Sequence, residues 1–485
     1  MHKQQRSKQC LVLVASILCW TNLTSPPRAV AQTYDIVISN GRVLDPESGL
    51  DGIRNVGILG HRIAAISTTP LKGKILVDAT GLAVAPGFID LHSHGQDAEN
   101  YRFKAMDGVT TALELEVGVW PVREWYDARA GKALINFGAS SGHIPARISV
   151  MKDSGTFLPR DTAVTESATP AQQSQILADL DEGMKQGALG LGMGLAYTPK
   201  VTPEEALNLF YLAAKWKRPV FVHMRYPGSQ TPGVIDSLQE MIADAAITGA
   251  SLHVVHINSM AGSKTPEALK MIEGARAHGL DVTTEAYPYI AGYTYIESGV
   301  FNPGWQKQLN ITYSDLMWVA TGERLTEESF NRYRKLGGPV IIFSNTEEMV
   351  RVAMSDPQVM IASDGILIHG AGHPRSAGTY ARLLGVCVRQ QKELTLMEAI
   401  RRASLAPAQR LEAYTPQMRN KGRLKVGADA DIDVFDSEQV IDKATYQQPA
   451  QYSYGFRYVL VGGTFVVRDG KLNETELPGQ AIRAQ

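Results

Sequence analysis

The chain is poor in cysteine, and its N-terminal apolar run is too short to cross a membrane. Its 485 residues include three cysteines, Cys10, Cys19 and Cys387. The first two lie in a leader-like segment, so removal of that segment leaves one cysteine and excludes an intramolecular disulfide. The apolar run from Leu11 to Leu18 is far below the roughly 20 residues that a membrane-spanning helix requires.

The chain also has no excess of basic residues, no internal repeats and no low-complexity segments. It contains 48 Lys and Arg against 49 Asp and Glu. Without the four basic residues of the leader, 44 basic and 49 acidic residues remain, a formal charge of −5. This balance argues against nucleic acid or an anionic membrane surface as a partner. We therefore expect a small-molecule substrate and a mature protein off the membrane; the pattern does not specify the oligomeric state.

Residues 1–31 have the features of a bacterial secretory signal peptide. Lys3, Arg6 and Lys8 precede the apolar run, and Ala29-Val30-Ala31 has the small-x-small form of a cleavage site. We expect cleavage before Gln32 and a periplasmic or secreted mature protein.

Both ends of the remaining chain are rich in short strand signals. Residues 34–44 alternate in hydrophobicity around Asn40-Gly41, a pair that predicts a β-hairpin. Residues 458–468 repeat this pattern around Gly462-Gly463. Because each strand-rich end is small, we expect the two ends to share one sheet domain.

Between residues 86 and 415, short apolar strands alternate with segments of helical periodicity. Alternation over about 330 residues favours a parallel sheet, and a closed (β/α)8 barrel of the TIM type fits this length. Residues 298–345 break the rhythm and are interpreted as an insertion near the barrel mouth, a candidate lid. Residues 32–85 and 416–485 then form the flanking sheet domain.

The stretch from Ala85 to Gly95 ends one predicted strand with His92 and His94. One residue separates them, so in a strand their rings lie on the same face. Neutral imidazole is a preferred zinc ligand, and two imidazoles on one rigid face can bind a divalent metal. The alternative is a pair of half-exposed histidines at a strand end.

Further polar residues close later apolar runs, namely His223, His256 and Asp364. The carboxyl ends of barrel strands converge on one face, so these side chains are expected to meet His92 and His94 there. His253 and His256 are three residues apart and would face opposite sides of a strand. We choose His256, at the tip, as the ligand and interpret His253 as a packed or surface residue.

Glu114 and Glu116 form another pair on one face of a strand. Two carboxylates on a buried face require cations nearby. Glu116 is closer to the C-terminal tip and is our preferred metal ligand, with Glu114 as the alternative.

Taken together, these motifs resemble a known family. The segment from Pro86 to His94 resembles the signature of the amidohydrolase superfamily. More narrowly, the mature chain is similar to the N-acyl-D-amino-acid deacylase (D-aminoacylase) family along nearly its whole length. The matching pieces include Gly108 to Thr111, Glu285 to Gly292, Ser363 to Gly365 and His373 to Tyr380.

This resemblance implies a metal-dependent hydrolase barrel with a small β-sandwich built from both termini. His92, His94 and Asp364 would surround one metal position, and His223 and His256 the other. The family carries a ligand cysteine after the strand that begins near Gly108, where this chain has Glu116 and Val117. Carboxylate oxygen also binds zinc, so we expect one or two zinc ions per chain, with manganese or other divalent ions admitted by the harder ligand. The chain has no convincing candidate for a carbamylated lysine.

The resemblance also implies an activity: hydrolysis of a linear C–N bond other than a peptide bond, releasing a carboxylate and a D-amino acid from an N-acyl-D-amino acid. Asp364 would act as general base and then as general acid. Arg375 would pair with the substrate carboxylate, which its planar fork suits. Tyr197 and Tyr289 would line the pocket, and His143 would help to polarise the carbonyl group.

Two other functions are consistent with the sequence. One is a related metal-dependent hydrolase that opens cyclic amides or cleaves dipeptides, of the dihydroorotase, hydantoinase or isoaspartyl dipeptidase type. The other is a catalytically inactive, exported binding protein. Substrate panels distinguish the first alternative, and metal analysis distinguishes the second.

Overall fold

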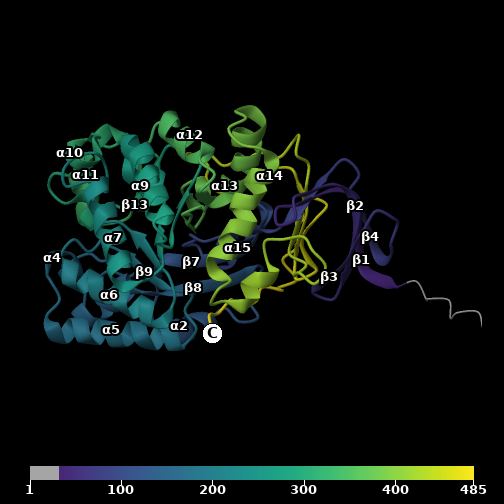
Figure 1. The fold of residues 1–485 in the computed structure, drawn as a ribbon. Coiled ribbons are helices and arrows are strands. Elements are labelled where there is room, and N and C mark those ends of the chain that lie inside the picture. Colours follow the sequence, from purple (N-terminus) through teal and green to yellow (C-terminus); the bar gives the residue numbers. More distant parts are fainter. Residues whose placement is uncertain (1–31) are drawn as a thin grey trace, which may run out of the picture.

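A computed structural model describes residues 32–485 (Figure 1). The predicted signal peptide, residues 1–31, lies outside the described residues. Two sheets dominate the described part, an eight-stranded parallel sheet surrounded by helices and a nine-stranded mixed sheet. Among residues 32–485, none of the helices combines the length and apolarity that crossing a bilayer requires.

The nine-stranded sheet combines strands from both ends of the described chain. In Figure 1 the purple N-terminal strands lie beside the yellow C-terminal segment. Its strands run in the order β22-β21-β20-β19-β5-β1-β2-β3, and β4 pairs with β1. The sheet folds over its own apolar core, to which Ile63 of β3 and Phe465 of β21 both contribute. The strands are β1 (Thr33–Asp45), β2 (Leu50–Leu59), β3 (Arg62–Ser67), β4 (Lys72–Asp78), β5 (Ala83–Pro86), β19 (Ile432–Phe435), β20 (Phe456–Val461), β21 (Thr464–Arg468) and β22 (Lys471–Leu472).

The prediction of a hairpin at Asn40-Gly41 was wrong. Strand β1 continues through both residues, and its pairing with β2 shifts register between Ile38 and Gly41, which identifies a β-bulge. Asn40 adopts φ +59°, and a Cβ on Gly41 would lie 2.4 Å from a methyl group of Val84. The pair therefore bends one strand toward β5. The turn at Gly462-Gly463, by contrast, is a true hairpin between β20 and β21.

The parallel sheet has eight strands, which confirms the predicted (β/α)8 barrel. They follow the order β16-β12-β11-β10-β9-β8-β7-β6. The two ends of the series meet beyond their last residues, where the Asp364 N–H donates to the His92 carbonyl at 2.7 Å. The strands are β6 (Phe88–Asp90), β7 (Val109–Val119), β8 (Asn136–Gly142), β9 (Leu191–Gly194), β10 (Val220–His223), β11 (Leu252–Val254), β12 (Val282–Ala286) and β16 (Val359–Ile361).

Helices pack around this barrel, and their ends follow local sequence signals. For example, α5 (Pro170–Lys185) starts with Thr169 as N-cap and proline at the first helical position, and Gln172 completes a capping box. The other helices of the barrel body are α1 (Ala98–Met106), α2 (Val122–Asp127), α3 (His143–Met151), α4 (Thr162–Thr165), α6 (Pro203–Trp216), α7 (Val234–Thr248), α8 (Ile257–Ala261), α9 (Thr265–Ala277), α12 (Glu347–Ser355), α13 (Arg375–Arg382), α14 (Leu396–Ile400) and α15 (Ala406–Leu411).

Residues 298–345, interpreted as an insertion, contribute two helices and two of the three strands of a small sheet beside the barrel, and the third strand, β13 (Gly292–Tyr295), comes just before them. Strands β13, β15 (Pro339–Ile342) and β14 (Leu316–Trp318) form an antiparallel sheet. Helices α10 (Trp305–Leu309) and α11 (Glu327–Leu336) pack on it through an apolar cluster that includes Trp305 and Phe330. The rings of these two residues stack at 5.2 Å, so the cluster holds α10 in place.

Candidate metal centre

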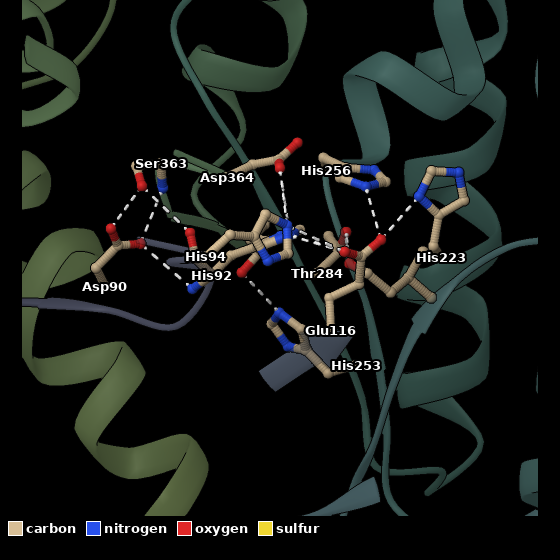
Figure 2. A network of polar contacts seen from close by, with 12 residues as sticks. Asp90, His92, His94, Glu116, His223, His253, His256, Thr284, Ser363 and Asp364 are labelled. Carbon is tan, nitrogen blue, oxygen red and sulfur yellow. Dashed lines mark hydrogen bonds and ion pairs between the residues drawn. The ribbon is translucent and has the colours of Figure 1, made fainter. Parts of the chain in front are cut away.

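Four donor atoms converge just beyond the ends of β6 and β16 and beside the last residues of β7, which contains Glu116 (Figure 2). They are the Nε2 atoms of His92 and His94, Oδ1 of Asp364 and Oε2 of Glu116, and we call them the inner donor group. Five pairs among these atoms are separated by 3.1–3.4 Å. Donors at about 2.0–2.1 Å from a tetrahedral zinc ion are about 3.3–3.4 Å from one another. These five separations are those expected between ligands that share one zinc ion.

Carboxylates lie behind both imidazoles of the inner donor group. Nδ1 of His92 lies 2.6 Å from Glu285 Oε1, and Nδ1 of His94 lies 2.8 Å from Glu114 Oε2. Burial alone would lower the pKa of each ring, but the surrounding carboxylates raise it, that of His92 to about 10. Without a metal ion, protons on the imidazoles therefore offset the carboxylate charge. With each Nδ1 donating to its carboxylate, the two Nε2 atoms, 3.1 Å apart, are left to bind a cation that replaces those protons.

Glu116, the preferred candidate on its strand, stands between two sets of imidazoles. Its Oε2 belongs to the inner donor group, and its Oε1 lies 2.8 Å from Nδ1 of His223 and 3.6 Å from Nε2 of His256. We call Glu116 Oε1, His223 Nδ1 and His256 Nε2 the second donor group. Burial alone would raise the pKa of Glu116, but hydrogen bonds from His223, His256 and His92 hold it well below its usual range. Glu116 can thus bridge two metal positions, and Glu114 supports His94 from behind.

Two residues of the centre adopt left-handed backbone conformations. His256 has φ +33° and Asp364 has φ +50°. Such conformations are uncommon for residues with a side chain and persist where the surrounding structure enforces them. At His256 the effect is to turn the ring inward after β11 has ended at Val254. Burial lowers the pKa of His223 despite its hydrogen bond to Glu116, so that imidazole is neutral and able to bind metal.

His253 also faces the barrel interior. Its ring is fully buried, with Nε2 at 3.1 Å from Glu285 Oε2 and Nδ1 at 2.7 Å from Thr283 Oγ1. Both His253 and His256 therefore serve the centre, one behind Glu285 and one in the second donor group. The sequence analysis missed Glu285 as a functional residue, although it lies near the end of a barrel strand as the other acidic candidates do.

A second buried network holds the loop that carries Asp364 against β6. Asp90 accepts from the backbone N–H of Ser363 at 2.9 Å and from its hydroxyl at 2.6 Å, as Figure 2 shows. Asp90 also forms an ion pair with Lys104 of α1 at 2.7 Å, and both side chains are buried. The sequence connects these residues because Asp90 precedes His92 by two positions and Ser363 precedes Asp364 by one.

The centre has a net negative charge that calls for cations. Its carboxylates are Glu114, Glu116, Glu285 and Asp364, all of them buried, and Arg375 is the guanidinium that pairs with one of them. When the imidazoles are neutral, as metal binding requires, four carboxylates against one guanidinium leave three negative charges in a dry site. Buried charges of one sign are strongly unfavourable unless they are paired or coordinate a metal. One or two divalent ions would offset this charge.

The structure places Arg375 behind Asp364. Its Nη2 lies 2.8 Å from Asp364 Oδ2, and its guanidinium carbon lies 4.4 Å above the ring of Tyr287. Within the described chain, Nε and Nη1 of Arg375 have no hydrogen-bond partner. Burial would raise the pKa of Asp364, but the charges of Arg375 and His92 lower it below its ordinary value. Asp364 is therefore ionised and shared between the donor group and Arg375.

A cavity of about 310 Å³ opens beside the centre and includes His223, His256 and Asp364 in its lining. Tyr197 also lines it, with its ring 4.6 Å from that of His223. Tyr289 does not reach the cavity, because its hydroxyl donates to Asp442 and its ring packs on His373. Tyr287 lines the cavity in its place.

The backbone just after β12 explains why Tyr287, and not Tyr289, lines the cavity. The N–H of Tyr289 donates to the carbonyl of Tyr287 at 3.0 Å, so the chain turns immediately after β12 and the two rings do not share a face. His143 is also outside the cavity lining. It is fully buried at the start of α3, with Nε2 at 3.1 Å from Glu205, which also pairs with Arg147. The structure thus gives His143 packing partners in place of the carbonyl-polarising role expected for it.

Comparison with known families and sequences agrees with this geometry. A family model described as "Amidohydrolase family" matches residues 76–321 and 346–467. N-acyl-D-glutamate deacylase of Alcaligenes xylosoxydans xylosoxydans is 29% identical over 500 aligned positions, which cover 93% of this chain and 97% of that one. D-aminoacylase of the same organism is 27% identical and covers 89% of this chain and 94% of its own length.

A solved structure is also similar to this chain over most of its length. The crystal structure of N-acyl-D-glutamate deacylase from Bordetella bronchiseptica, complexed with zinc and a phosphonate mimic of the tetrahedral intermediate, has a TM-score of 0.78 to this chain. The two are 27% identical, and the match covers 93% of this chain and all of the crystallised one.

Proposed function

Because the chain belongs to the amidohydrolase family, we propose that it is a zinc-dependent enzyme that hydrolyses N-acyl-D-amino acids to a carboxylate and a D-amino acid. The observation that carries this proposal is the convergence of the Nε2 atoms of His92 and His94, 3.1 Å apart, beside the carboxylates of Glu116 and Asp364. Relatives named as N-acyl-D-glutamate deacylase and D-aminoacylase, matched over most of both chains, support the choice of substrate.

The donor chemistry suits zinc. His92, His94 and Asp364, with Glu116 in contact with both imidazoles, would hold one ion. Glu116, His223 and His256 would hold a second. When bound, zinc lowers the pKa of a water molecule toward neutrality and polarises a carbonyl group. Nitrogen and carboxylate oxygen are both zinc ligands, so the glutamate in place of the family's cysteine is compatible with this ion.

Asp364 is the residue that would move the proton. Its Oδ1 faces the inner donor group, and its pKa is held below the ordinary value by Arg375 and His92 against the effect of burial. An ionised carboxylate at this place can accept a proton from the attacking water and then deliver it to the departing nitrogen. Arg375, by holding Oδ2 at 2.8 Å, keeps the carboxylate oriented for both steps.

Arg375 and Tyr287 are our candidates for binding the substrate carboxylate. Within the described chain, the Tyr287 hydroxyl and two nitrogens of Arg375 are buried without a hydrogen-bond partner. Unsatisfied buried donors are unfavourable and therefore mark a place that a ligand can fill. A guanidinium fork and a phenol side by side suit a carboxylate.

Release of free amine from a substrate panel tests the activity. Zinc-loaded protein is mixed with N-acetyl-D-leucine, N-acetyl-D-glutamate, N-acetyl-L-leucine and the cyclic amide dihydroorotate. We expect turnover of at least one N-acetyl-D-amino acid and much slower reaction of the L-enantiomer and of the cyclic amide. Turnover of the cyclic amide alone would assign the chain to the ring-opening branch. A folded, zinc-loaded protein with no turnover of any of the four would contradict the proposal.

We also propose that the protein is exported and that residues 1–31 are its signal peptide. The support is the basic start, the short apolar run and the Ala29-Val30-Ala31 site. N-terminal sequencing of the protein recovered from a periplasmic extract of a bacterial host should start at Gln32. An intact N-terminus on a protein retained in the cytoplasm would contradict export.

A further inference from the structure

The wall of the cavity beside the metal centre combines hydroxyl groups with large apolar side chains. The hydroxyl groups of Tyr287 and Tyr293 line it together with His223, His256 and Asp364, and both are buried and unpartnered within the described chain. Among the described lining residues, the large aliphatic side chains and the tryptophan are Met260, Val300, Trp305, Leu309 and Ile342, and the uncharged polar residues Asn302, Gln308 and Ser344 also contribute.

Most of this apolar wall comes from the segment that interrupts the barrel. Trp305 and Leu309 lie on α10, and Ile342 ends β15. Trp305 is 6% exposed and packs against Phe301 and Phe330, so the wall is part of a formed core. A rigid apolar surface of this kind stabilises an apolar group that is transferred to it from water.

Beyond the metal centre and the proposed site of the α-carboxylate, no unpaired positive charge lines the described wall of the cavity. Arg225 is the single lysine or arginine among its described lining residues. Its Nε and Nη2 donate to the two carboxylate oxygens of Glu240 at 3.0 and 2.7 Å, and its Nη1 donates to the carbonyl of Val201 at 2.7 Å. Arg375, behind the centre, is paired with Asp364. A second carboxylate on the substrate would therefore lose its hydration without gaining an unpaired cation, which is strongly unfavourable.

From this distribution, and on the premise that the proposed deacylase function holds, we propose that the substrate is an N-acyl-D-amino acid with an aliphatic or aromatic side chain. The α-carboxylate lies at the end that carries the tyrosine hydroxyls, and the side chain lies against Trp305, Leu309 and Ile342. The acidic side chain named for the N-acyl-D-glutamate deacylases has no counterpart cation in this wall.

The first test is the ratio of kcat/KM values measured on zinc-loaded full-length mature protein. The substrates are N-acetyl-D-leucine, N-acetyl-D-phenylalanine, N-acetyl-D-glutamate and N-acetyl-D-aspartate. Sites that leave a polar group unpaired discriminate strongly, so we expect the apolar pair to exceed the acidic pair by about 100-fold or more. A preference for glutamate or aspartate would overturn this inference and leave the deacylase function standing. No turnover of any of the four would overturn the deacylase function and the inference together.

Two variants test the residues responsible. Glu240→Gln keeps a hydrogen-bonding partner for Arg225 but removes the charge that neutralises it, and Leu309→Lys places a new cation on the half-buried surface of α10. Each should raise kcat/KM for N-acetyl-D-glutamate relative to N-acetyl-D-leucine by roughly 10-fold or more, since about 1.4 kcal/mol of new ion pairing suffices.

The control is Glu267→Gln on the exposed surface of α9, which should leave the ratio unchanged. Thermal melting shows whether each variant is folded. If either variant fails to fold, the other still carries the test. Folded variants whose leucine-to-glutamate ratios equal that of the parent would overturn the assignment of the wall.

Discussion

Replacing Glu285 with glutamine isolates the contribution of the carboxylate behind His92. Glu285 is 1% exposed; its Oε1 lies 2.6 Å from His92 Nδ1, and its Oε2 lies 3.1 Å from His253 Nε2. Glutamine has the same shape. Its carbonyl oxygen can still accept from His92, and its amide can donate to His253, which then donates from Nδ1 to Thr283. The change therefore removes charge while keeping the contacts.

The expected result is weaker zinc binding in a protein that still folds. Carboxylates behind metal-bound histidines contribute about 10- to 100-fold to metal affinity, which is about 1.4–2.8 kcal/mol. The stability of the zinc-free protein should fall as well. Burial would raise the pKa of Glu285, but the charge of His92 and the hydrogen bonds from His253 and His92 lower it to about 2, so the ionised side chain stabilises the folded state at neutral pH.

The assay is a competition titration of zinc between the protein and a chromophoric chelator, with urea denaturation of the zinc-stripped proteins beside it. Glu267→Gln, on the exposed surface of α9, is the matched control and should change neither quantity. An unchanged zinc affinity in a folded Glu285→Gln protein would refute the reasoning. So would a zinc-stripped variant that is as stable as the parent at pH 7, because the charge of Glu285 would then have no favourable interaction with the two imidazoles.

Three further substitutions test other parts of the structure. Asp364→Asn should reduce kcat by about 100- to 10,000-fold while zinc content stays near that of the parent, and retained turnover would remove Asp364 from the proton transfer. Burial and the charge of Glu240 raise the pKa of Asp244 to about 6, so stability falls as the pH rises from about 4 through 6. Solvent screening reduces the effect of this shift, so Asp244→Asn should increase the free energy of unfolding at pH 8 by about 1–2 kcal/mol but not at pH 4, and identical urea midpoints at pH 8 would contradict this. Gly118 has φ +67°, and a Cβ there would lie 2.6 Å from Gly142 Cα. Gly118→Ala should destabilise the fold by at least about 1–2 kcal/mol in urea denaturation. A urea midpoint equal to that of the parent would contradict the backbone strain expected at this position.

The sequence predicts well what depends on strand alternation. His92 and His94 share a face because one residue separates them, and their Nε2 atoms do meet at 3.1 Å. Alternation also places Glu114 and Glu116 on one face, but it cannot rank them. The structure distinguishes them by their contacts. Glu116 Oε2 contacts Nε2 of His92 within the inner donor group, whereas Glu114 contacts Nδ1 of His94, on the opposite side of that ring.

Strand alternation predicts the wrong side-chain direction where a strand ends before its apolar sequence pattern does. Strand β11 stops at Val254, and His256 turns inward through a left-handed conformation, so His253 and His256 both face the interior. Beyond β12 the chain turns at Tyr287, which brings this ring, and not that of Tyr289, to the cavity. Such local backbone reversals leave little trace in hydrophobic periodicity.

The Asn40-Gly41 pair illustrates a related limit. The same dipeptide suits a tight hairpin and a bulge, because both require a positive φ. The distinguishing feature is the close packing of Gly41 against Val84, which lies on β5, more than forty residues along the chain. Contacts between distant segments therefore decide between conformations that local sequence leaves equivalent.

Zinc quantification coupled to activity tests the central claim most directly. The mature protein is stripped with a chelator and titrated with zinc, and bound metal and the rate of N-acetyl-D-amino acid hydrolysis are measured at each step. We predict that one or two zinc ions bind per chain and that activity is absent without zinc and returns with the bound metal. A folded protein that binds no zinc, or one whose hydrolysis is unaffected by complete metal removal, would contradict the claim that His92, His94, Glu116 and Asp364 form a catalytic metal centre.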